Sequence, residues 1–489
     1  MDSKQTTKHD TEVGYVVNTR DFLVYLDGFP SVHINDLVES ESGPRGWITS
    51  LSKDLVEVLM LDEGKVKPHD AFHLLPDALG LAVGEFLLGR AINPVGVPID
   101  GKGQLQKTKD VKIYPLDKPA PGIEAREFIN EQFLTGITTV DSLIPIGKGQ
   151  RELILGDAHS GKTQFLLDVI VNQKGSNVIC VYASIGKSAV SVRNLIDSLR
   201  ANNALAYTII VAASSSESAP LIFLTPKTAF TVAEYFQKQG KEVLLILDDL
   251  LIHAKIHREI SLLSQRPPGK ESYPGDTFHQ HASLIERAGN FSKEAGSGSI
   301  TALPVAELNL SDFTTLIPTN LMAMTDGHLL FKSSLYAQGQ RPSIDISLSV
   351  SRVGRQTQDR LSNLLSTKIR LLLAEAADLE TIARFSSELP AQTRLTLLQK
   401  ELIMEIIKQD PLTAIPKKIQ LLLLSLPFTT FLQDKNKAFI EKYKKVLIEA
   451  FLKDPTLSKI GKGMDKIKTE EELIKILEGA GGVLTKICQ

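Results

Sequence analysis

Hydrophobic and polar residues follow one another in three different patterns along the chain. Residues 14–78 contain short apolar segments rich in β-forming residues, such as 22–26 and 56–60, and glycines and prolines separate these segments. Short strands with turns at this spacing are typical of a small β-barrel or sandwich. Residues 1–13 are mostly polar, and we expect them to form a short disordered N-terminus.

The middle of the protein, residues 79–358, alternates apolar runs of strand length with helical patterns. The runs cover residues 152–155, 177–182, 208–211 and 243–247. Buried strands that alternate with helices predict a parallel sheet covered by helices, which is an α/β domain. Within this domain, residues 290–299 contain several Gly, Ser and Lys residues and are predicted to form a flexible loop.

The last part of the protein, residues 359–489, is predicted to be an α-helical domain. Apolar residues recur at helical spacing in residues 361–383 and 394–407. Pro411, Pro416 and Pro427 divide the region further, because proline interrupts a helix. The hydrophobic pattern therefore predicts a multidomain protein with a β domain, an α/β domain and a helical domain.

The composition limits the classes of function. The protein has 489 residues, a formal net charge of −2 and two cysteines, Cys180 and Cys488. This charge gives no general attraction to nucleic acid, and two distant cysteines provide neither a disulfide framework nor a paired metal site. The most apolar stretch, residues 421–426, is far shorter than the ~20 residues that span a bilayer, so a membrane role is expected to be peripheral.

One segment of eight residues matches the phosphate-binding pattern G-x-x-x-x-G-K-[ST] in full. Its residues are Gly156, Asp157, Ala158, His159, Ser160, Gly161, Lys162 and Thr163. Such glycines let the backbone curl so that N–H groups point at phosphate oxygens, while Lys162 balances the phosphate charge. Thr163 would ligate Mg²⁺, and the helix that continues through Gln164 would direct its positive end at the phosphates. The segment predicts a site for ATP or ADP with Mg²⁺.

An acidic residue ends the apolar run 243–247. If this run is a strand of the parallel sheet, Asp248 lies at the carboxyl end of the sheet, where ligands bind in such folds. We therefore expect Asp248 to hold the metal through its water shell. The alternative is that Asp248 caps a helix.

Further motifs surround the phosphate loop in a recognisable order. Before it come LGR at 88–90, IDGKG at 99–103, TGI at 135–137, VDSLIPIG at 140–147 and GQRELI at 149–154. After it come DDL at 248–250, RPPG at 266–269, YPGD at 273–276, TALP at 301–304, IPTN at 317–320 and SVSRVG at 349–354. Over nearly its whole length, the sequence resembles the alpha subunit of rotary F-type ATP synthases, as a divergent member.

The resemblance implies a fold, partners and a cellular place. The fold is an N-terminal β-barrel, a central α/β P-loop (RecA-like) nucleotide-binding domain and a C-terminal α-helical domain. Three alpha and three beta subunits form a ring around a gamma-type central shaft, and the complex makes ATP from ADP and phosphate with a transmembrane proton gradient. The protein would be a peripheral membrane protein on the cytoplasmic side of a bacterial plasma membrane, or of an equivalent organelle membrane.

The resemblance also implies that catalysis occurs on beta and that alpha holds a nucleotide without turnover. In catalytic relatives a glutamate base follows the glycine after the second core strand, whereas this sequence has Lys187 after Gly186. A lysine stays protonated at neutral pH and is no base. Arg352 matches the arginine finger that reaches into the neighbouring beta site and stabilises charge on the γ-phosphate. The alternatives are a solvated loop charge for Lys187 and a structural ion pair for Arg352.

Other matches and departures concern the base and the stalk. Arg341, Pro342 and Gln409 match family positions near the adenine, although Gln409 could also be a surface helix residue. The family usually has Arg-Gln-Thr where this sequence has Ala158, His159 and Ser160, so nucleotide affinity is expected to differ. About a dozen residues precede the barrel region, so the helix that docks the delta-type stalk subunit is expected to be shortened or absent.

Three other classes compete with this interpretation. A self-sufficient hexameric ATPase of the export class would need the glutamate base that Lys187 replaces. A non-catalytic ring component that has lost turnover agrees with Ala158 in the phosphate loop. An RNA translocase related to Rho would need a basic barrel, but residues 14–78 carry many acids.

Overall fold

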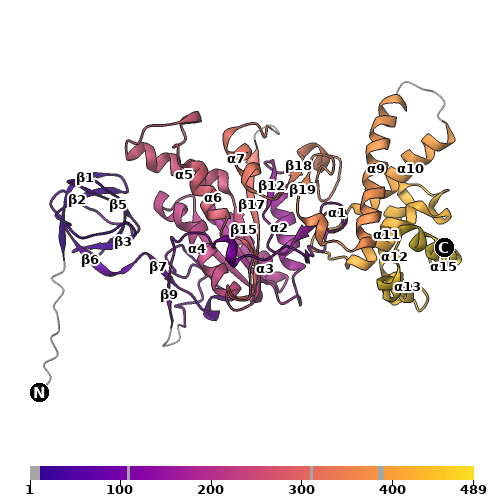
Figure 1. The fold of residues 1–489 in the computed structure, drawn as a ribbon, viewed down its shortest axis with the longest axis horizontal. Helices are drawn as coiled ribbons and strands as arrows, with labels where there is room; N and C mark the ends of the chain where they lie inside the picture. Colours follow the sequence, from indigo (N-terminus) through magenta and orange to yellow (C-terminus); the bar gives the residue numbers. More distant parts are fainter. Residues whose placement is uncertain (1–11, 107–110, 309–311, 384–389) are drawn as a thin grey trace, which may run out of the picture.

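The computed structural model describes residues 12–106, 111–308, 312–383 and 390–489. The protein forms three bodies in a row, with the β-barrel at one end, the α/β domain in the middle and the helical domain at the other end (Figure 1). This arrangement confirms the predicted fold class. Residues 1–11, which make up most of the predicted disordered N-terminus, lie outside the described residues.

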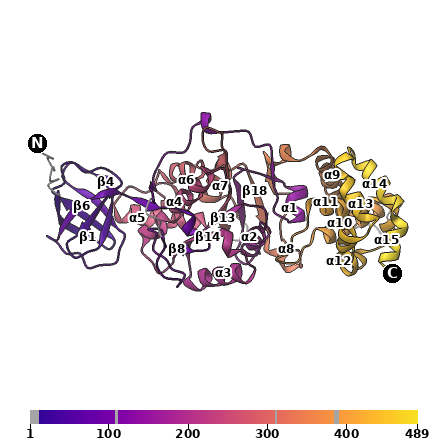
Figure 2. The same ribbon diagram turned by 90° about the horizontal axis from the view of Figure 1, so that it is seen from below.

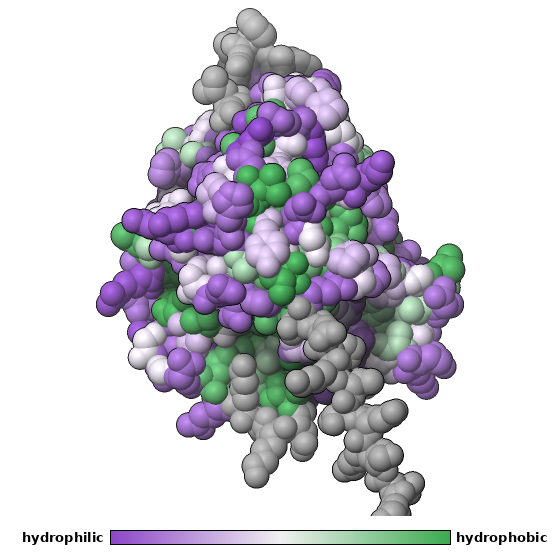
Figure 3. Space-filling model, turned by 90° about the vertical axis from the view of Figure 1, so that its left-hand side faces the viewer, coloured by the Kyte–Doolittle hydropathy of each residue, from purple (hydrophilic) through white to green (hydrophobic). Residues whose placement is uncertain are grey.

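Six antiparallel strands form a closed barrel in the order β1-β2-β5-β4-β3-β6. The strands are β1 (Val13–Arg20), β2 (Leu23–Asp27), β3 (Asp36–Ser40), β4 (Arg45–Leu51), β5 (Val56–Met60) and β6 (Ala71–Ala78). The barrel closes because β1 pairs with both β2 and β6. Val24, Ile48, Val58 and Phe72 fill its interior. The outer end of the barrel shows hydrophilic side chains with smaller hydrophobic areas between them (Figure 3).

A nine-stranded sheet forms the centre of the α/β domain, in the order β19-β18-β12-β17-β15-β13-β14-β8, with β16 paired to β17. Its strands are β8 (Ala91–Ile92), β12 (Glu152–Asp157), β13 (Ile179–Lys187), β14 (Thr208–Ser214), β15 (Glu242–Asp248), β16 (Gly289–Asn290), β17 (Ser299–Leu308), β18 (Gly327–Phe331) and β19 (Val350–Ser351). The core strands are parallel, as the hydrophobic pattern predicts. Two smaller pairs join β7 (Gly80–Ala82) to β9 (Ile113–Pro115) and β10 (Gln132–Phe133) to β11 (Ile146–Gly147).

Helices cover both faces of this sheet. They are α1 (Thr138–Leu143), α2 (Lys162–Val171), α3 (Ala189–Ala201), α4 (Ala219–Gln237), α5 (Leu250–Leu263), α6 (Thr277–Ile285), α7 (Leu316–Met324) and α8 (Ser333–Ala337). Side chains of a strand alternate between its two faces, and in β12 Ile154 packs in one hydrophobic core while Leu153 and Leu155 pack in the other. Figure 2 shows α4 and α6 on one side of the sheet and α3 on the other.

The predicted loop at residues 290–299 lies between β16 and β17 and is well packed. Asn290 pairs with Ser299 across the antiparallel strands β16 and β17, and the N–H of Phe291 donates to the carbonyl of Gly298 at 3.2 Å. Phe291 is also buried in the core of the domain. The Gly and Ser residues therefore form a tight, hydrogen-bonded turn rather than a loose insertion.

Seven helices form the C-terminal domain in the part of the sequence that the structure describes. They are α9 (Arg360–Ala383), α10 (Ala391–Ile407), α11 (Lys417–Ser425), α12 (Lys437–Lys453), α13 (Leu457–Gly463), α14 (Glu470–Gly479) and α15 (Gly481–Ile487). Pro416 immediately precedes α11, where its missing N–H costs no helical hydrogen bond. Within the described residues, no helix is both long enough and apolar enough to cross a membrane.

Specific contacts join the three bodies. Trp47 of the barrel stacks on Phe223 of α4 with ring centroids 6.3 Å apart. At the other end, the Gln420 side chain of α11 donates to Asp141 Oδ2 at 3.0 Å and accepts from the Ser142 hydroxyl at 3.1 Å. These buried contacts hold the α/β domain, and the site within it, between its two neighbours.

Candidate nucleotide-binding site

The phosphate loop lies between the end of β12 and the start of α2, which is the context that the motif requires. Gly161 has φ +91°, a left-handed conformation that favours glycine, and a Cβ atom there would lie 3.1 Å from the ring of Tyr336. Ser160 is buried, and its hydroxyl donates to the carbonyl of Asp157 at 2.7 Å. The two exposed residues at the tip of the loop, Ala158 and His159, depart from the family pattern.

Lys162 lies beneath this loop. Its side chain is buried, and Nζ donates to the carbonyl oxygens of Gly156 at 2.7 Å and of Asp157 at 2.6 Å. Glu307, at the end of β17, places a carboxylate oxygen 3.9 Å from the same nitrogen. Burial lowers the pKa of Lys162 although Glu307 opposes this effect. Lys162 is therefore positioned where the loop would hold phosphates.

The first turn of α2 presents two further predicted residues. Thr163 is exposed at the N-terminal end of the helix. Gln164 is half-buried, and its amide donates to Asp168 Oδ1 at 2.8 Å. Asp168 in turn accepts from the N–H of Leu412 at 2.8 Å and so ties α2 to the helical domain.

Asp248 lies at the carboxyl end of β15 beside the end of β13, as predicted. It does not cap the following helix: the neighbouring Asp249 does so, because its Oδ1 accepts from the N–H of Ile252 at 2.7 Å. Asp248 accepts from the Tyr182 hydroxyl at 2.7 Å and contacts Lys187 Nζ at 2.9 Å. The lysine therefore belongs to an ion-pair network and is not a solvated loop charge.

The predicted magnesium ligands differ in how well they suit a metal ion. Thr163 is exposed at the phosphate loop, so its hydroxyl can face an ion beside the phosphates. One oxygen of Asp248, in contrast, accepts a hydrogen bond from Tyr182, and the other forms an ion pair with the Lys187 ammonium. Thr163 therefore suits a divalent ion, whereas the positive charge of Lys187 disfavours such an ion beside Asp248.

Two of the three residues predicted near the adenine line one cavity of about 680 Å³. Arg341 and Gln409 line this cavity, and the N–H of Gln409 donates to the carbonyl of Arg341 at 2.8 Å. The Arg341 guanidinium lies 3.4 Å from the ring centroid of Tyr336, the residue that also lies against Gly161. Pro342 follows Arg341 through a cis peptide bond. The structure thus brings the predicted base residues next to the phosphate loop.

Gln409 is not a surface helix residue. Its side-chain oxygen accepts from the N–H and the hydroxyl of Thr138, both at 3.1 Å, and its amide donates to the carbonyl of Gly136 at 2.7 Å. The side chain therefore links the C-terminal domain to the start of α1. Gln409 therefore joins the two domains and also lines the cavity where the base is predicted to bind.

Arg352 lies away from this site. Arg352 follows the edge strand β19 and is exposed. Its backbone N–H donates to the carbonyl of Asp326 at 2.9 Å, and its Nη1 donates to the carbonyl of Thr325 at 3.3 Å. Gly327, the residue after Asp326, pairs with Glu152 at the amino end of β12, whereas the phosphate loop begins at the carboxyl end near Gly156. Four residues of strand separate the two levels, about 13 Å. Arg352 therefore lies at the opposite end of the strand from the loop.

Several residues of the site are not predicted by the sequence. Tyr182, Asp249 and Glu307 contact the predicted lysines and acids, and Tyr336 covers the phosphate loop. The doublet of Asp248 and Asp249 is visible as a motif, and the acid after the apolar run of β17 is a comparable signal. The position of Tyr336 has no such signal, because it depends on how α8 folds back over the loop.

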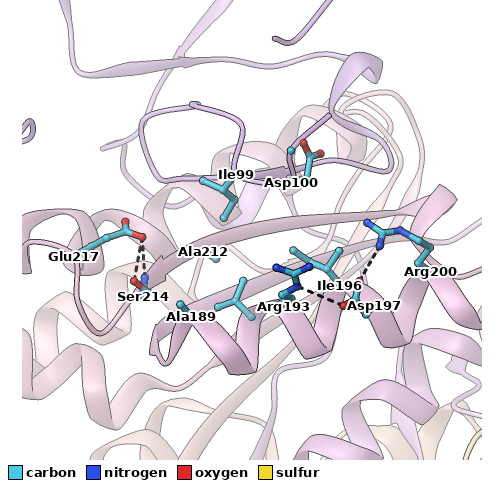
Figure 4. A pocket seen from close by; sticks show the side chains of 12 residues that line it. Ile99, Asp100, Ala189, Arg193, Ile196, Asp197, Arg200, Ala212, Ser214 and Glu217 are labelled. Carbon is cyan, nitrogen blue, oxygen red and sulfur yellow. Dashed lines mark hydrogen bonds and ion pairs between the residues drawn. The ribbon is translucent and has the colours of Figure 1, made fainter. Parts of the chain in front are cut away.

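A second cavity, of about 560 Å³, lies apart from the phosphate loop between α3 and the segment after β8 (Figure 4). Arg193 and Arg200 border it, and both pair with Asp197, at 3.9 and 2.8 Å. None of the predicted site residues lines this cavity. It is therefore separate from the nucleotide site.

Comparison with known proteins identifies the family. Residues 136–351 match the model of the nucleotide-binding domain of the ATP synthase alpha/beta family, and residues 358–480 match that of the C-terminal domain of ATP synthase alpha/beta chains. The protein therefore belongs to the ATP synthase alpha/beta family.

Its relatives include proteins named ATP synthase subunit alpha. That of Metamycoplasma arthritidis is 40% identical over 95% of this sequence and 88% of the relative, and that of Mycoplasmoides gallisepticum is 41% identical over 91% and 86%. The protein of Mycoplasma pneumoniae is 37% identical over 96% of this sequence and 89% of its own length. The resemblance to ATP synthase alpha subunits is thus confirmed, and with it a role in nucleotide binding, ATP synthesis and ion transport.

Proposed function

We propose that this alpha subunit holds ATP or ADP in its own site without turnover and supplies Arg352 to the catalytic site of a neighbouring beta subunit. The position of Arg352 carries this proposal. Arg352 is exposed and lies at the end of β12 opposite the subunit's own phosphate loop, and this position supports a role at a different nucleotide. A planar guanidinium there would stabilise charge on a γ-phosphate in the transition state.

The subunit's own site is suited to holding a nucleotide. Lys162 and the backbone of the phosphate loop would bind the phosphates. Arg341 and Gln409 border the space for the base, and Pro342 follows Arg341 through the cis peptide bond. Thr163 would contact the Mg²⁺ ion that accompanies the nucleotide, and this ion would supply charge neutralisation at the phosphates. Lys187 stands where catalytic relatives have a glutamate, and an ammonium group cannot accept a proton from water.

The assignment of this protein as an alpha subunit also suggests how it assembles with other subunits. We propose a ring of three such subunits and three beta subunits around a gamma-type shaft, coupled to a proton gradient at the cytoplasmic side of the membrane. Docking of a delta-type stalk subunit would depend on the N-terminal segment, most of which lies outside the described residues.

One reconstitution separates this function from its alternatives. ATP hydrolysis and retained nucleotide are measured for the purified subunit alone and after assembly with its beta partner. We expect retained nucleotide with negligible hydrolysis by the subunit alone, and hydrolysis after assembly. Turnover by the subunit alone would contradict the proposal and favour a self-sufficient export-type ATPase. An assembled ring without activity would instead indicate a non-catalytic ring component.

A further inference from the structure

A lysine stands among the acidic residues at the carboxyl edge of the sheet. Lys187 ends β13, and its Nζ atom lies 2.9 Å from Oδ1 of Asp248 and 3.3 Å from Oδ2 of Asp249. The other oxygen of Asp248 accepts a hydrogen bond from the Tyr182 hydroxyl at 2.7 Å. Each oxygen of Asp248 therefore has a donor from within the same subunit.

The burial of this cluster gives the lysine a role in its charge balance. The side chains of Asp248 and Asp249 are only 7% and 4% exposed. Two adjacent carboxylates with so little water repel each other, and a nearby cation offsets this repulsion. A lysine ammonium stays charged at neutral pH, and the two carboxylates beside Lys187 favour that charged form.

The same ammonium lies at the sheet edge that carries the phosphate loop, because β12, β17, β15 and β13 are parallel and end at that edge. Burial is the main cause that lowers the pKa of Lys162, and the positive charge of Lys187 adds to this effect. Lys162 lies under the phosphate loop, and Lys187 ends β13, the strand that pairs with β15. A bound triphosphate would thus meet two positive groups that belong to the subunit itself.

A divalent ion at Asp248 would compete with this arrangement. Mg²⁺ in phosphate-loop sites keeps several waters, and an acidic side chain normally accepts hydrogen bonds from them. Here the charge of Asp248 is already balanced by Lys187. An ion beside Asp248 would be repelled by the ammonium or would have to displace it from two carboxylates. The uncharged hydroxyl of Thr163 would remain as the only predicted metal contact.

We propose that the ammonium of Lys187 takes the place of the divalent metal beside Asp248, so that this site binds ATP and ADP with an affinity nearly independent of Mg²⁺. The proposal rests on the nucleotide-holding function proposed above and specifies its ionic requirement. It assigns to Lys187 a role in specificity, because the residue decides whether metal-free nucleotide is accepted.

Binding of ATP to the full-length subunit tests this proposal. Affinity is measured by titration calorimetry in excess Mg²⁺ and in excess EDTA, for the wild type, Lys187→Gln and Lys187→Arg. Lys187→Gln removes the charge and frees Asp248, while Lys187→Arg retains the charge. Lys174→Gln, which removes an exposed lysine beyond the end of α2, is the matched control.

For the wild type, Lys187→Arg and Lys174→Gln, we expect the affinity for ATP to differ by less than about threefold between the two conditions. Lys187→Gln should bind ATP at least about tenfold more tightly with Mg²⁺ than without it. Tm shifts on adding ATP with Mg²⁺ or EDTA should show the same pattern, and they also report whether Lys187→Gln is folded. A wild type that requires Mg²⁺, or a Lys187→Gln variant that behaves like the metal-independent wild type, would overturn the proposal. If no form binds ATP under either condition, the nucleotide-holding function itself is wrong.

Discussion

Gly354 controls the position of Arg352, and replacing it with alanine tests how much that position matters. Gly354 is buried, and its N–H donates to the Ser351 hydroxyl at 3.1 Å. A Cβ atom added at Gly354 would lie 1.7 Å from the carbonyl oxygen of Pro145, whereas real Cβ atoms essentially never approach within 3.0 Å of such an atom. The turn therefore has to move by about 1.3 Å, the difference between 1.7 and 3.0 Å.

The expected effects follow from the size of this shift. Overpacking of this kind lowers the free energy of unfolding by about 1–3 kcal/mol. A displacement of about 1 Å in a group that acts on the transition state lowers the rate on the order of 100-fold. We therefore expect Gly354→Ala to lower ATP hydrolysis by the complex assembled with beta about 100-fold. Nucleotide binding by the subunit's own site should not change, because Lys162 lies at the opposite end of β12.

The assay is steady-state ATP hydrolysis at saturating ATP, together with chemical denaturation of the isolated subunit. Gly463→Ala is the control, because a Cβ atom at Gly463, at the end of α13, would meet no atom within 4 Å. The reasoning would be refuted if Gly354→Ala showed the expected destabilisation but kept the hydrolysis rate within about threefold of the wild type.

Two further predictions concern stability. Arg287 and Glu234 form a buried ion pair with Nε and Oε1 2.7 Å apart. Glu234→Ala should therefore lower the free energy of unfolding, measured in urea, by about 3–5 kcal/mol. A loss below about 1 kcal/mol would contradict this prediction. Burial acts to raise the pKa of Asp100, but hydrogen bonds, chiefly from Arg90, lower it to about 2 from 3.8. This pair should therefore stabilise the protein above pH ~4 and lose its effect as the pH falls through ~2, and Asp100→Asn should remove that part of the pH dependence of unfolding.

The sequence is most informative where structure is determined locally. The long apolar runs of β12, β13 and β15 predict the sheet, and the phosphate loop predicts its own position between a strand and a helix. The barrel strands β3 and β6 are not predicted, because most of their residues are polar or partly exposed and only a few, such as Val38 and Phe72, face the interior. Half-buried strands of this kind show only a weak hydrophobic pattern.

The network around Lys187 could not be predicted from the sequence. Lys187 is recognisable as a departure from the glutamate of catalytic relatives, but its contact with Asp249 joins residues 62 positions apart. That contact exists because β13 and β15 are neighbours in the sheet and end at the same edge. Strand order is a property of the whole fold, so local patterns do not reveal which side chains meet there.

The most direct test of the central claim is ATP hydrolysis by the complex that contains the Arg352→Ala variant. Arg355→Ala is the matched control, because Arg355 is also exposed. Its guanidinium donates to the side chains of Asn363 and Thr367, whereas that of Arg352 donates to the carbonyl of Thr325. The account predicts that Arg352→Ala lowers the rate at least about 1,000-fold while nucleotide retained by the alpha subunit is unchanged. It also predicts that Arg355→Ala leaves the rate near that of the wild type. Full activity of the Arg352→Ala complex would contradict the claim that this subunit supplies the arginine of its neighbour's catalytic site.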